Sequence, residues 1–149
     1  MEIPEYITKD EVKRVCRQLN IRDWTRLTKP EVVPEEAEII LEHVNVMHMP
    51  VCPDSFHRGL EVELEHGTMF EDANVTNNHP LLTGKIVLAH LKESDDYYER
   101  LEVAEIEGDM LKALVNKDSA KLMTKYRALL DAKYVLTQEE LKPLKRKKS

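Results

Sequence analysis

The sequence has little glycine and few aromatic residues: four glycines, and 5% Phe, Trp and Tyr, in 149 residues. Strands draw on aromatic and β-branched side chains, so this composition disfavours a mainly β fold. Hydrophobic residues make up 42% of the chain, and a chain of this length can bury a sizeable core without disulfides or metal. We therefore expect an all-α protein with a single domain.

Cysteine and long apolar runs are also scarce. Cys16 falls in a helical pattern and Cys52 in a loop, so a disulfide framework is not expected and a reducing compartment is the default. No stretch approaches the roughly 18 apolar residues that span a bilayer. Residues 1–10 lack the basic start and apolar core of an export signal. We expect an intracellular protein, in the cytoplasm or a host nucleus, without membrane partners.

The net charge of −6 is unevenly distributed along the chain. Five of the 22 basic residues lie in the last eight positions, which leaves 17 basic against 28 acidic residues, a net charge of −11, in residues 1–141. An acidic body repels phosphates, so nucleic acid is expected to bind only through the tail or a local patch.

Capping and breaking residues predict a compact bundle of five to seven helices. Gly67 is the expected left-handed cap of the third helix, and Ser94 the expected N-cap of the fifth. A short turn, TQEELK, is expected after the last long helix. The predicted helices are Thr8 to about Leu19, Pro34 to about Val44, Ser55–His66, Pro80 to about Lys92, Ser94 to about Leu114, and about Asp118 to Tyr134.

Apolar residues at helical spacing indicate which faces enter the core. The Pro80 helix has Leu82, Ile86 and Ala89 on one face and Leu81, Leu88 and Leu91 on another, so it is expected to be central. The next helix repeats Tyr97, Leu101, Ala104, Gly108, Leu111 and Leu114. The last presents Leu122, Met123, Tyr126, Leu129 and Leu130. We divide the domain into residues 1–53, 54–115 and 116–141, followed by a flexible basic tail, 142–149.

Three blocks in the middle of the chain, FHRGLEVELEHG, NVTNNHPLLTGKIVLAHLKE and DYYERL, resemble a family of small uncharacterised proteins, a domain of unknown function found in bacteria and large DNA viruses. The first helix, ITKDEVKRVCRQLNI, is similar to that family's opening helix. The chain departs from the family in a longer stretch, about Thr25 to Pro53, and in its basic tail. The resemblance implies a helical fold, gives no activity, and suggests a viral origin.

Two Glu/His pairs at i, i+3 spacing are the candidate site: Glu63 with His66, and His90 with Glu93. Carboxylate and imidazole one turn apart on facing helices can converge on one interior point, where they could hold zinc, iron or manganese. The alternative is a structural polar cluster in which buried groups satisfy one another and brace the loop from Thr68 to His79.

The remaining histidines, His43, His48, His57 and His79, show no matching spacing and are interpreted as surface or loop residues. No nucleophile motif, phosphate-binding glycine loop or Cys/His zinc spacing occurs in the sequence. No catalytic residue and no cofactor are therefore predicted, apart from the alternative of a divalent metal at the Glu/His pairs.

The basic run Lys145, Arg146, Lys147 and Lys148 follows Pro143. Successive cations on an extended chain are typical of signals bound by nuclear import receptors, although such a run can also be a solubilising end. The leading hypothesis is a non-catalytic interaction or accessory protein, directed to a host nucleus by this tail. The alternatives are a metal-binding protein or metal-dependent enzyme, and a DNA-binding protein that uses the first two helices and the tail.

Overall fold

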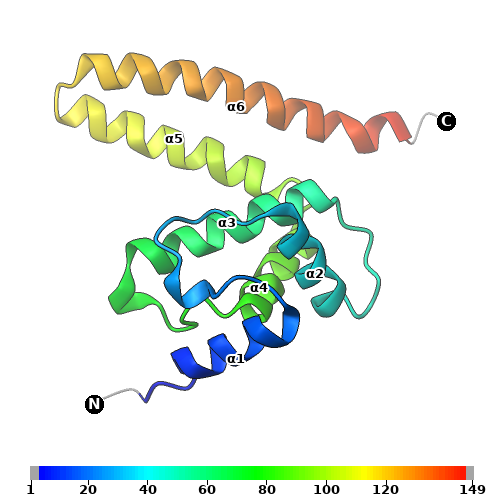
Figure 1. Ribbon diagram of the computed structural model, residues 1–149. Helices are drawn as coiled ribbons and strands as arrows, with labels where there is room; N and C mark the ends of the chain where they lie inside the picture. Colours follow the sequence, from blue (N-terminus) through cyan, green and yellow to red (C-terminus); the bar gives the residue numbers. More distant parts are fainter. Residues whose placement is uncertain (1–3, 147–149) are drawn as a thin grey trace. The chain divides into compact units, whose positions relative to one another are not determined.

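The computed structural model describes residues 4–146, with side chains up to residue 144, and this stretch contains helices and no strand (Figure 1). The predicted all-α fold is therefore confirmed. The helices are α1 (Lys9–Leu19), α2 (Pro34–Val44), α3 (Pro53–Met69), α4 (Pro80–Glu93), α5 (Tyr97–Val115) and α6 (Ser119–Arg146), with short 3-10 turns η1 (Trp24–Arg26) and η2 (Glu71–Ala73).

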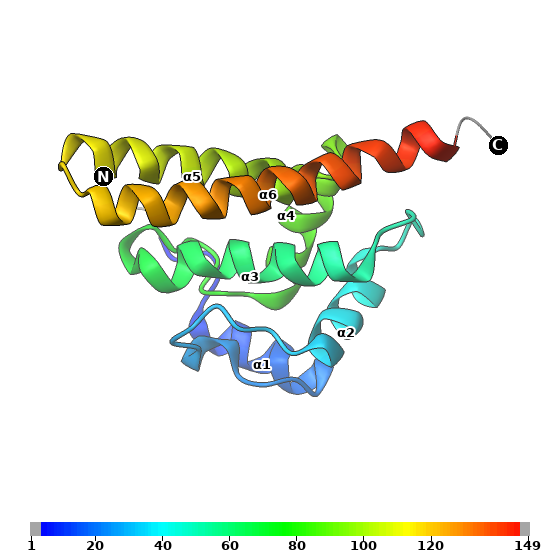
Figure 2. The same ribbon diagram turned by 90° about the horizontal axis from the view of Figure 1, so that it is seen from above.

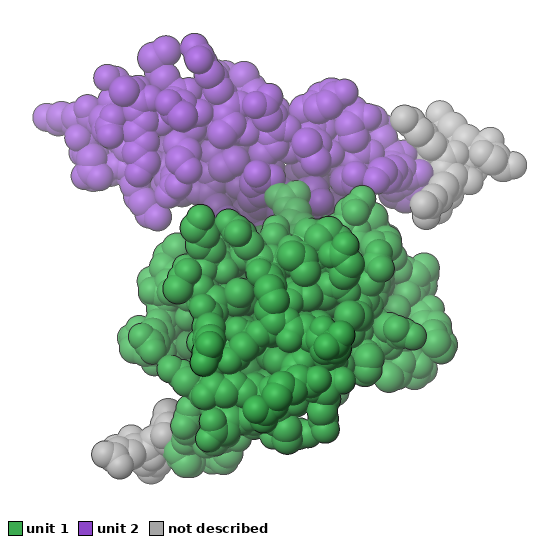
Figure 3. Space-filling view, viewed as in Figure 1, with its two compact units in different colours: residues 1–95 green, residues 96–149 purple. Residues whose placement is uncertain are grey.

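The chain divides into two compact units, Met1–Asp95 and Asp96–Ser149 (Figure 3). The division falls between α4 and α5. The sequence instead predicted one domain with internal boundaries after residues 53 and 115. Each unit buries its own set of apolar side chains.

In the first unit, α2, α3 and α4 pack against one another, and α1 packs against η1 and α4 (Figures 1 and 2). The predicted starts hold for α1 and α2: Thr8 Oγ1 accepts a hydrogen bond from the Glu11 N–H at 3.2 Å, and Pro34 occupies the first turn of α2. The fully buried side chains include Trp24, Ile40, Phe56, Leu60, Leu64 and Val87.

The connection between α1 and α2 is fixed by the buried carboxylate of Glu36. It accepts hydrogen bonds from the Arg22 backbone N–H and guanidinium at 2.8–2.9 Å, and from Trp24 Nε1 at 3.3 Å. Burial alone would raise the pKa of Glu36, but these hydrogen bonds outweigh it and hold the pKa below the ordinary value of 4.5. The carboxylate therefore stays charged and ties three segments together.

The predicted cap at Gly67 is wrong, because α3 continues two residues further and Gly67 has a helical φ. Gly67 lies on the buried side of α3, about one turn after Leu64. A Cβ added to Gly67 would lie 2.1 Å from Asn78 Oδ1 and 3.0 Å from Asn74 Nδ2. The glycine is needed for the close approach of these side chains to α3.

The predicted face of α4 is also only partly right. Its buried residues are Pro80, Thr83, Gly84, Val87, Leu88 and Leu91. Ile86 and Ala89 are exposed, so α4 is not buried all round. Gly84 makes room for α2, because a Cβ there would lie 2.6 Å from Ile40 Cγ2.

The second unit is a hairpin of two long helices, α5 and α6. Ser94 ends α4 rather than starting α5: its backbone is extended and its N–H bonds to His90 O. Asp96 is the N-cap of α5. Helix α6 does not stop near Tyr134 but runs to Arg146, with Pro143 in its last turn. A proline there removes one hydrogen bond near the helix end, where water can replace it.

None of the helices within residues 4–146 combines the length and the apolar character needed to cross a bilayer.

Candidate functional site

Glu63 on α3 and His90 on α4 come together as the sequence predicted. His90 Nε2 lies 3.5 Å from Glu63 Oε1, and the two side chains are 29% and 15% exposed. The contact joins two neighbouring helices of the first unit by a polar pair at the edge of the core. Such a pair stabilises the packing of α3 against α4.

His66 and Glu93 do not complete the predicted four-residue site, because both are exposed. Each lies two residues beyond a buried leucine, Leu64 or Leu91, which places it about 200° around its helix from that leucine. Within the described part of the chain, no three His, Cys, Asp or Glu side chains are grouped so that they could hold a metal ion. The structure therefore brings together two of the four predicted residues.

The loop before α4 is tied down by its asparagines, a role that the sequence analysis missed. Asn74 Nδ2 donates to Gly67 O at 3.1 Å and to Asn78 Oδ1 at 2.9 Å, and Asn77 Nδ2 donates to Ile7 O at 2.6 Å. Asn77 and Asn78 have φ values of 48° and 60°, in the left-handed region that asparagine tolerates. The signal in the sequence was three asparagines within five residues, directly before His79, a histidine that the structure buries.

His79 is that buried histidine, and it caps α4: its Nδ1 accepts from the Leu82 N–H at 3.4 Å. Burial lowers the pKa of His79 below 6.5, against the attraction of Glu11, so the imidazole is held neutral. A neutral ring is what the capping geometry requires, since Nδ1 accepts a hydrogen bond. The role is structural.

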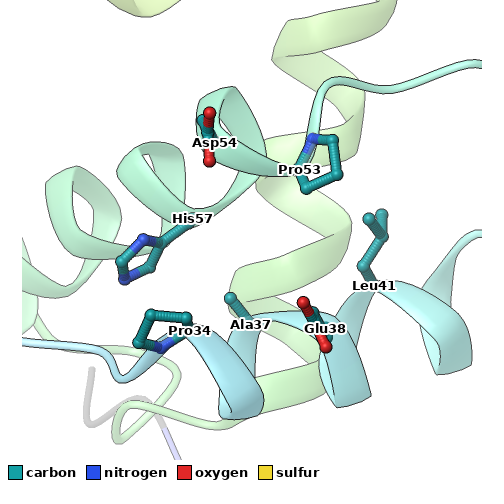
Figure 4. A pocket seen from close by; sticks show the side chains of 7 residues that line it. All are labelled: Pro34, Ala37, Glu38, Leu41, Pro53, Asp54 and His57. Atoms are coloured by element: carbon teal, nitrogen blue, oxygen red, sulfur yellow. The ribbon is translucent and has the colours of Figure 1, made fainter.

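His57 is half-buried on α3 rather than a surface or loop residue. Its Nε2 donates to Val32 O at 2.6 Å, and Glu61 Oε1 accepts from the Val32 N–H at 3.1 Å. His57 also lines a cavity of about 90 Å³ between α2 and α3 (Figure 4), together with Pro34, Ala37, Glu38, Leu41, Pro53 and Asp54. This volume holds a few water molecules, well below the size of a typical small-molecule site.

The α5–α6 hairpin has a register that two ion pairs define. Arg100 pairs with Glu140 at 2.9 Å, and Glu107 pairs with Lys133 at 3.1 Å. Seven residues forward on α5 and seven back on α6 lead from the first pair to the second. The same step again places Leu114 opposite Tyr126. One edge of the hairpin thus changes from ion pairs to apolar residues toward the turn between the helices.

Leu114 and Tyr126 belong to a contiguous apolar surface. Leu111 is one turn before Leu114, Met123 is one turn before Tyr126, and Leu130 is one turn after it, so all five share one side of the hairpin. These side chains are 52% to 62% exposed. We call Leu111, Leu114, Met123, Tyr126 and Leu130 the tip face. Contiguous exposed apolar patches are typical of interaction sites in proteins, whereas scattered apolar residues are ordinary on a protein surface.

Helical periodicity predicted that the residues of the tip face would lie in the core. Helix α5 instead buries Tyr98, Glu99, Ile106 and Ala113. The hairpin core consists of Ile106, Leu129 and Ala132, with Val103, Met110 and Ala128 packed against it. An antiparallel pair of helices can cover one narrow stripe on each, so residues one position further round remain outside. The signal was an apolar face wider than one partner helix can bury.

The predicted basic tail is only partly described. Lys145 and Arg146 form the last residues of α6, so the helix extends into the region that was expected to be flexible. Lys147 and Lys148 lie outside the described residues.

One family model matches residues 12–107, and its description is "protein of unknown function (DUF5661)". The matched stretch includes the three blocks on which the predicted resemblance was based, so the prediction of a domain of unknown function is confirmed. The matched stretch ends at residue 107, so the whole tip face, which begins at Leu111, lies outside it. No curated protein and no solved structure matches the chain.

Proposed function

We propose that this chain, which belongs to this family of proteins of unknown function, is a non-catalytic interaction protein. It binds another macromolecule through the tip face. The observation that carries the proposal is the exposure of five neighbouring apolar side chains on one side of the α5–α6 hairpin. A partner that covers them removes apolar surface from water, and this burial stabilises the complex by roughly 25 cal/mol for each Å² of apolar area.

The contrast with the first unit supports the proposal. Exposed apolar residues of the first unit such as Val46, Met47 and Val75 lie in turns, whereas Trp24, Ile40 and Phe56 are fully buried. The buried polar groups Glu36 and His79 have hydrogen-bond partners inside the same unit. These groups have structural roles. The tip face makes no such contribution to the core of its own hairpin, so its apolar character is available to a partner.

Site-specific photocrosslinking in cells that naturally produce the protein tests the proposal. A photoreactive phenylalanine analogue at Tyr126 should form one defined crosslinked product, because its ring lies in the tip face. The same analogue at Tyr6, which is exposed in the first unit and therefore far in sequence from the tip face, is the matched control. The product should disappear when Leu130→Ser is added. Equal crosslinking at both positions, or none at Tyr126, would contradict the proposal.

A second candidate function concerns the tail. We propose that Lys145, Arg146, Lys147 and Lys148 direct the protein to a host nucleus, as expected if the chain is viral and acts in a eukaryotic cell. Four successive cations after a proline support this, since import receptors bind such runs in extended form. Lys145 and Arg146 would have to leave the last turn of α6, which Pro143 has already weakened by removing a hydrogen bond.

Nuclear import of a fluorescent fusion, large enough to be excluded from passive diffusion, tests the tail. Removing residues 144–149 should leave helicity and melting temperature almost unchanged and abolish nuclear accumulation. Replacing the four basic residues with alanine should do the same, whereas Lys→Arg at positions 145, 147 and 148 keeps the charge and should preserve import. If the intact fusion stays in the cytoplasm, the targeting proposal fails.

A further inference from the structure

The α5–α6 hairpin is strongly polarised in charge along its length. Residues 97–109 contain five acidic residues and one basic residue, whereas residues 110–130 contain five basic residues and one acidic residue. We call residues 110–130 the basic segment, and all five residues of the tip face lie within it. Arg127, exposed, lies four residues after Met123 and three before Leu130, and therefore borders the tip face directly.

The shape of the tip face fits a helix. Its residues come from two antiparallel helices, with Leu111 and Leu114 on α5 and the others on α6. Side chains from two such helices flank a shallow groove, and a third helix laid along it would complete a three-helix bundle. A helix binding there would present apolar residues at i, i+3, i+4 and i+7.

A second copy of the chain fits poorly. Placing the two tip faces together would bring two basic segments, each with five cations to one carboxylate, against each other. Placing the basic segment of one copy on the acidic segment of the other would set the tip face against the Arg100–Glu140 and Glu107–Lys133 ion pairs. Its apolar side chains would then remain uncovered.

An anionic membrane surface is also disfavoured. The tip face is continuous with those ion pairs, and the carboxylates of Glu107 and Glu140 are about half exposed, so they would approach anionic headgroups. Two of the cations, Lys112 and Lys125, are held by Asp109 at 3.3 and 2.7 Å. Lys117, Lys121 and Arg127 are the exposed cations of the segment outside these two ion pairs. Three such charges are too few to dominate over the carboxylates at a lipid surface.

We infer that the partner of the tip face is an acidic amphipathic α-helix of another protein. This inference rests on the proposed interaction function and adds the partner's chemistry to it. The apolar side of the helix covers Leu111, Leu114 and Leu130, and its flanking Glu or Asp residues face Arg127 and the lysines of the basic segment. The apolar contact supplies affinity, and the opposite charges supply orientation and a faster association rate.

Fluorescence anisotropy with the full chain tests the inference. The probe is a labelled synthetic helix of about 20 residues, about 30 Å long, with leucine at i, i+3, i+4 and i+7 and glutamate on its flanks. One control peptide has the same composition in scrambled order, and another has lysine in place of glutamate. We expect binding of the acidic helix that weakens with added salt, and affinity at least about tenfold lower for both controls.

Two protein variants, each with its own control variant, locate the binding site. The double change Tyr126→Ser and Leu130→Ser should weaken binding of the acidic helix by about tenfold or more, whereas Tyr6→Ser, at an exposed site of the first unit, should leave it unchanged. Arg127→Glu should weaken binding, and Arg17→Glu, at an exposed position of α1, is the charge control. All of these side chains are exposed, so circular dichroism should show unchanged helicity.

Several outcomes would overturn the inference. Equal affinity for the scrambled peptide, or equal loss in Tyr6→Ser, would remove the tip face from the contact. Cosedimentation with phosphatidylserine-containing vesicles that is lost in the double variant, without peptide binding, would assign the face to lipid. A dimer in sedimentation velocity that Leu130→Ser dissociates would assign it to a second copy. If the peptide fails while the crosslink at Tyr126 persists, the interaction function stands and the acidic helix is rejected.

Discussion

Single residues in this protein matter most where a side chain is absent or buried. Gly67 and Gly108 both lie inside helices, but a Cβ at Gly67 meets Asn78 and Asn74, whereas a Cβ at Gly108 meets nothing within 4 Å. The two glycines therefore have different structural roles. One permits a close approach, and the other is open to substitution.

Gly67→Ala should lower the free energy of unfolding by about 1–3 kcal/mol, because Asn78 must move and lose its hydrogen bond to Asn74. Gly108→Ala should raise it by about 0.5–1 kcal/mol, since alanine loses less backbone entropy in a helix. Urea denaturation of both variants measures the difference. Equal effects in the two would show that the contact with Asn78 is unimportant.

His79 should make the stability depend on pH. Its folded-state pKa lies below 6.5, so the unfolded chain takes up a proton first as the pH falls. The stabilisation is complete above pH 6.5 and is lost progressively below it. The free energy of unfolding should fall between pH 7.5 and 5.5, and the fall should be smaller in His79→Asn, which keeps a capping acceptor. His43→Asn, at an exposed site, should behave like the parent chain.

The Glu63–His90 contact gives a further prediction at this scale. Glu63→Ala should cost about 1–3 kcal/mol, because it leaves a half-buried partner without this carboxylate. Glu65→Ala, exposed on the same helix, should cost less than about 0.5 kcal/mol. Chelator should not change the melting temperature of the parent chain. A melting temperature that falls on chelation and recovers with one metal would instead support a metal site.

At the scale of elements, charged and polar side chains fix how the helices of the first unit are connected. Glu36 joins α2 to Arg22 and to Trp24 of η1, and His57 and Glu61 hold the backbone of Val32 against α3. These contacts join segments that are far apart in sequence. They explain why residues 20–33, which contain little helix, still have a defined path.

Glu36→Ala should lower the free energy of unfolding by about 2–3 kcal/mol, because Trp24 Nε1 and the Arg22 backbone N–H lose a charged acceptor. Arg22 is 43% exposed, so its guanidinium can turn to water, which limits the loss. Glu42→Ala, exposed on the same helix, should stay within about 0.5 kcal/mol. Thermal and urea unfolding followed by circular dichroism measure both.

At the scale of the whole molecule, the two units differ in charge and in core. Residues 1–95 carry 10 basic and 18 acidic residues, whereas residues 96–149 carry 12 basic and 10 acidic residues. The first unit contains most of the buried apolar residues, and the hairpin core has three. A net charge of −8 and a full core suit a stable scaffold. A net charge of +2 and an exposed apolar face suit binding.

Amide hydrogen exchange should reflect this difference. The amides of α2, α3 and α4 should exchange slowly, because opening them exposes a large core. Amides of residues 111–125 in the hairpin should exchange faster, since few buried contacts resist local opening there. Glu36→Ala should speed exchange in the first unit. If the hairpin exchanged as slowly as α3, its small core would not be the factor that limits its stability.

The sequence by itself determined that the protein is all-α and where most helices begin. Capping residues such as Thr8 and Pro34 act on their own next few residues, so their effect can be predicted locally. The sequence also predicted that Glu63 and His90 would lie close together, because helix periodicity places both toward the core side of neighbouring helices.

The tertiary structure decided which apolar faces are buried. Periodicity shows that Leu111, Leu114, Met123, Tyr126 and Leu130 share helix faces with core-forming positions, but burial depends on how many neighbouring helices are present to cover them. In the hairpin each helix has one partner, which covers one stripe. The side chains beside that stripe stay in water, and the same apolar residues that predicted a core became the candidate binding surface.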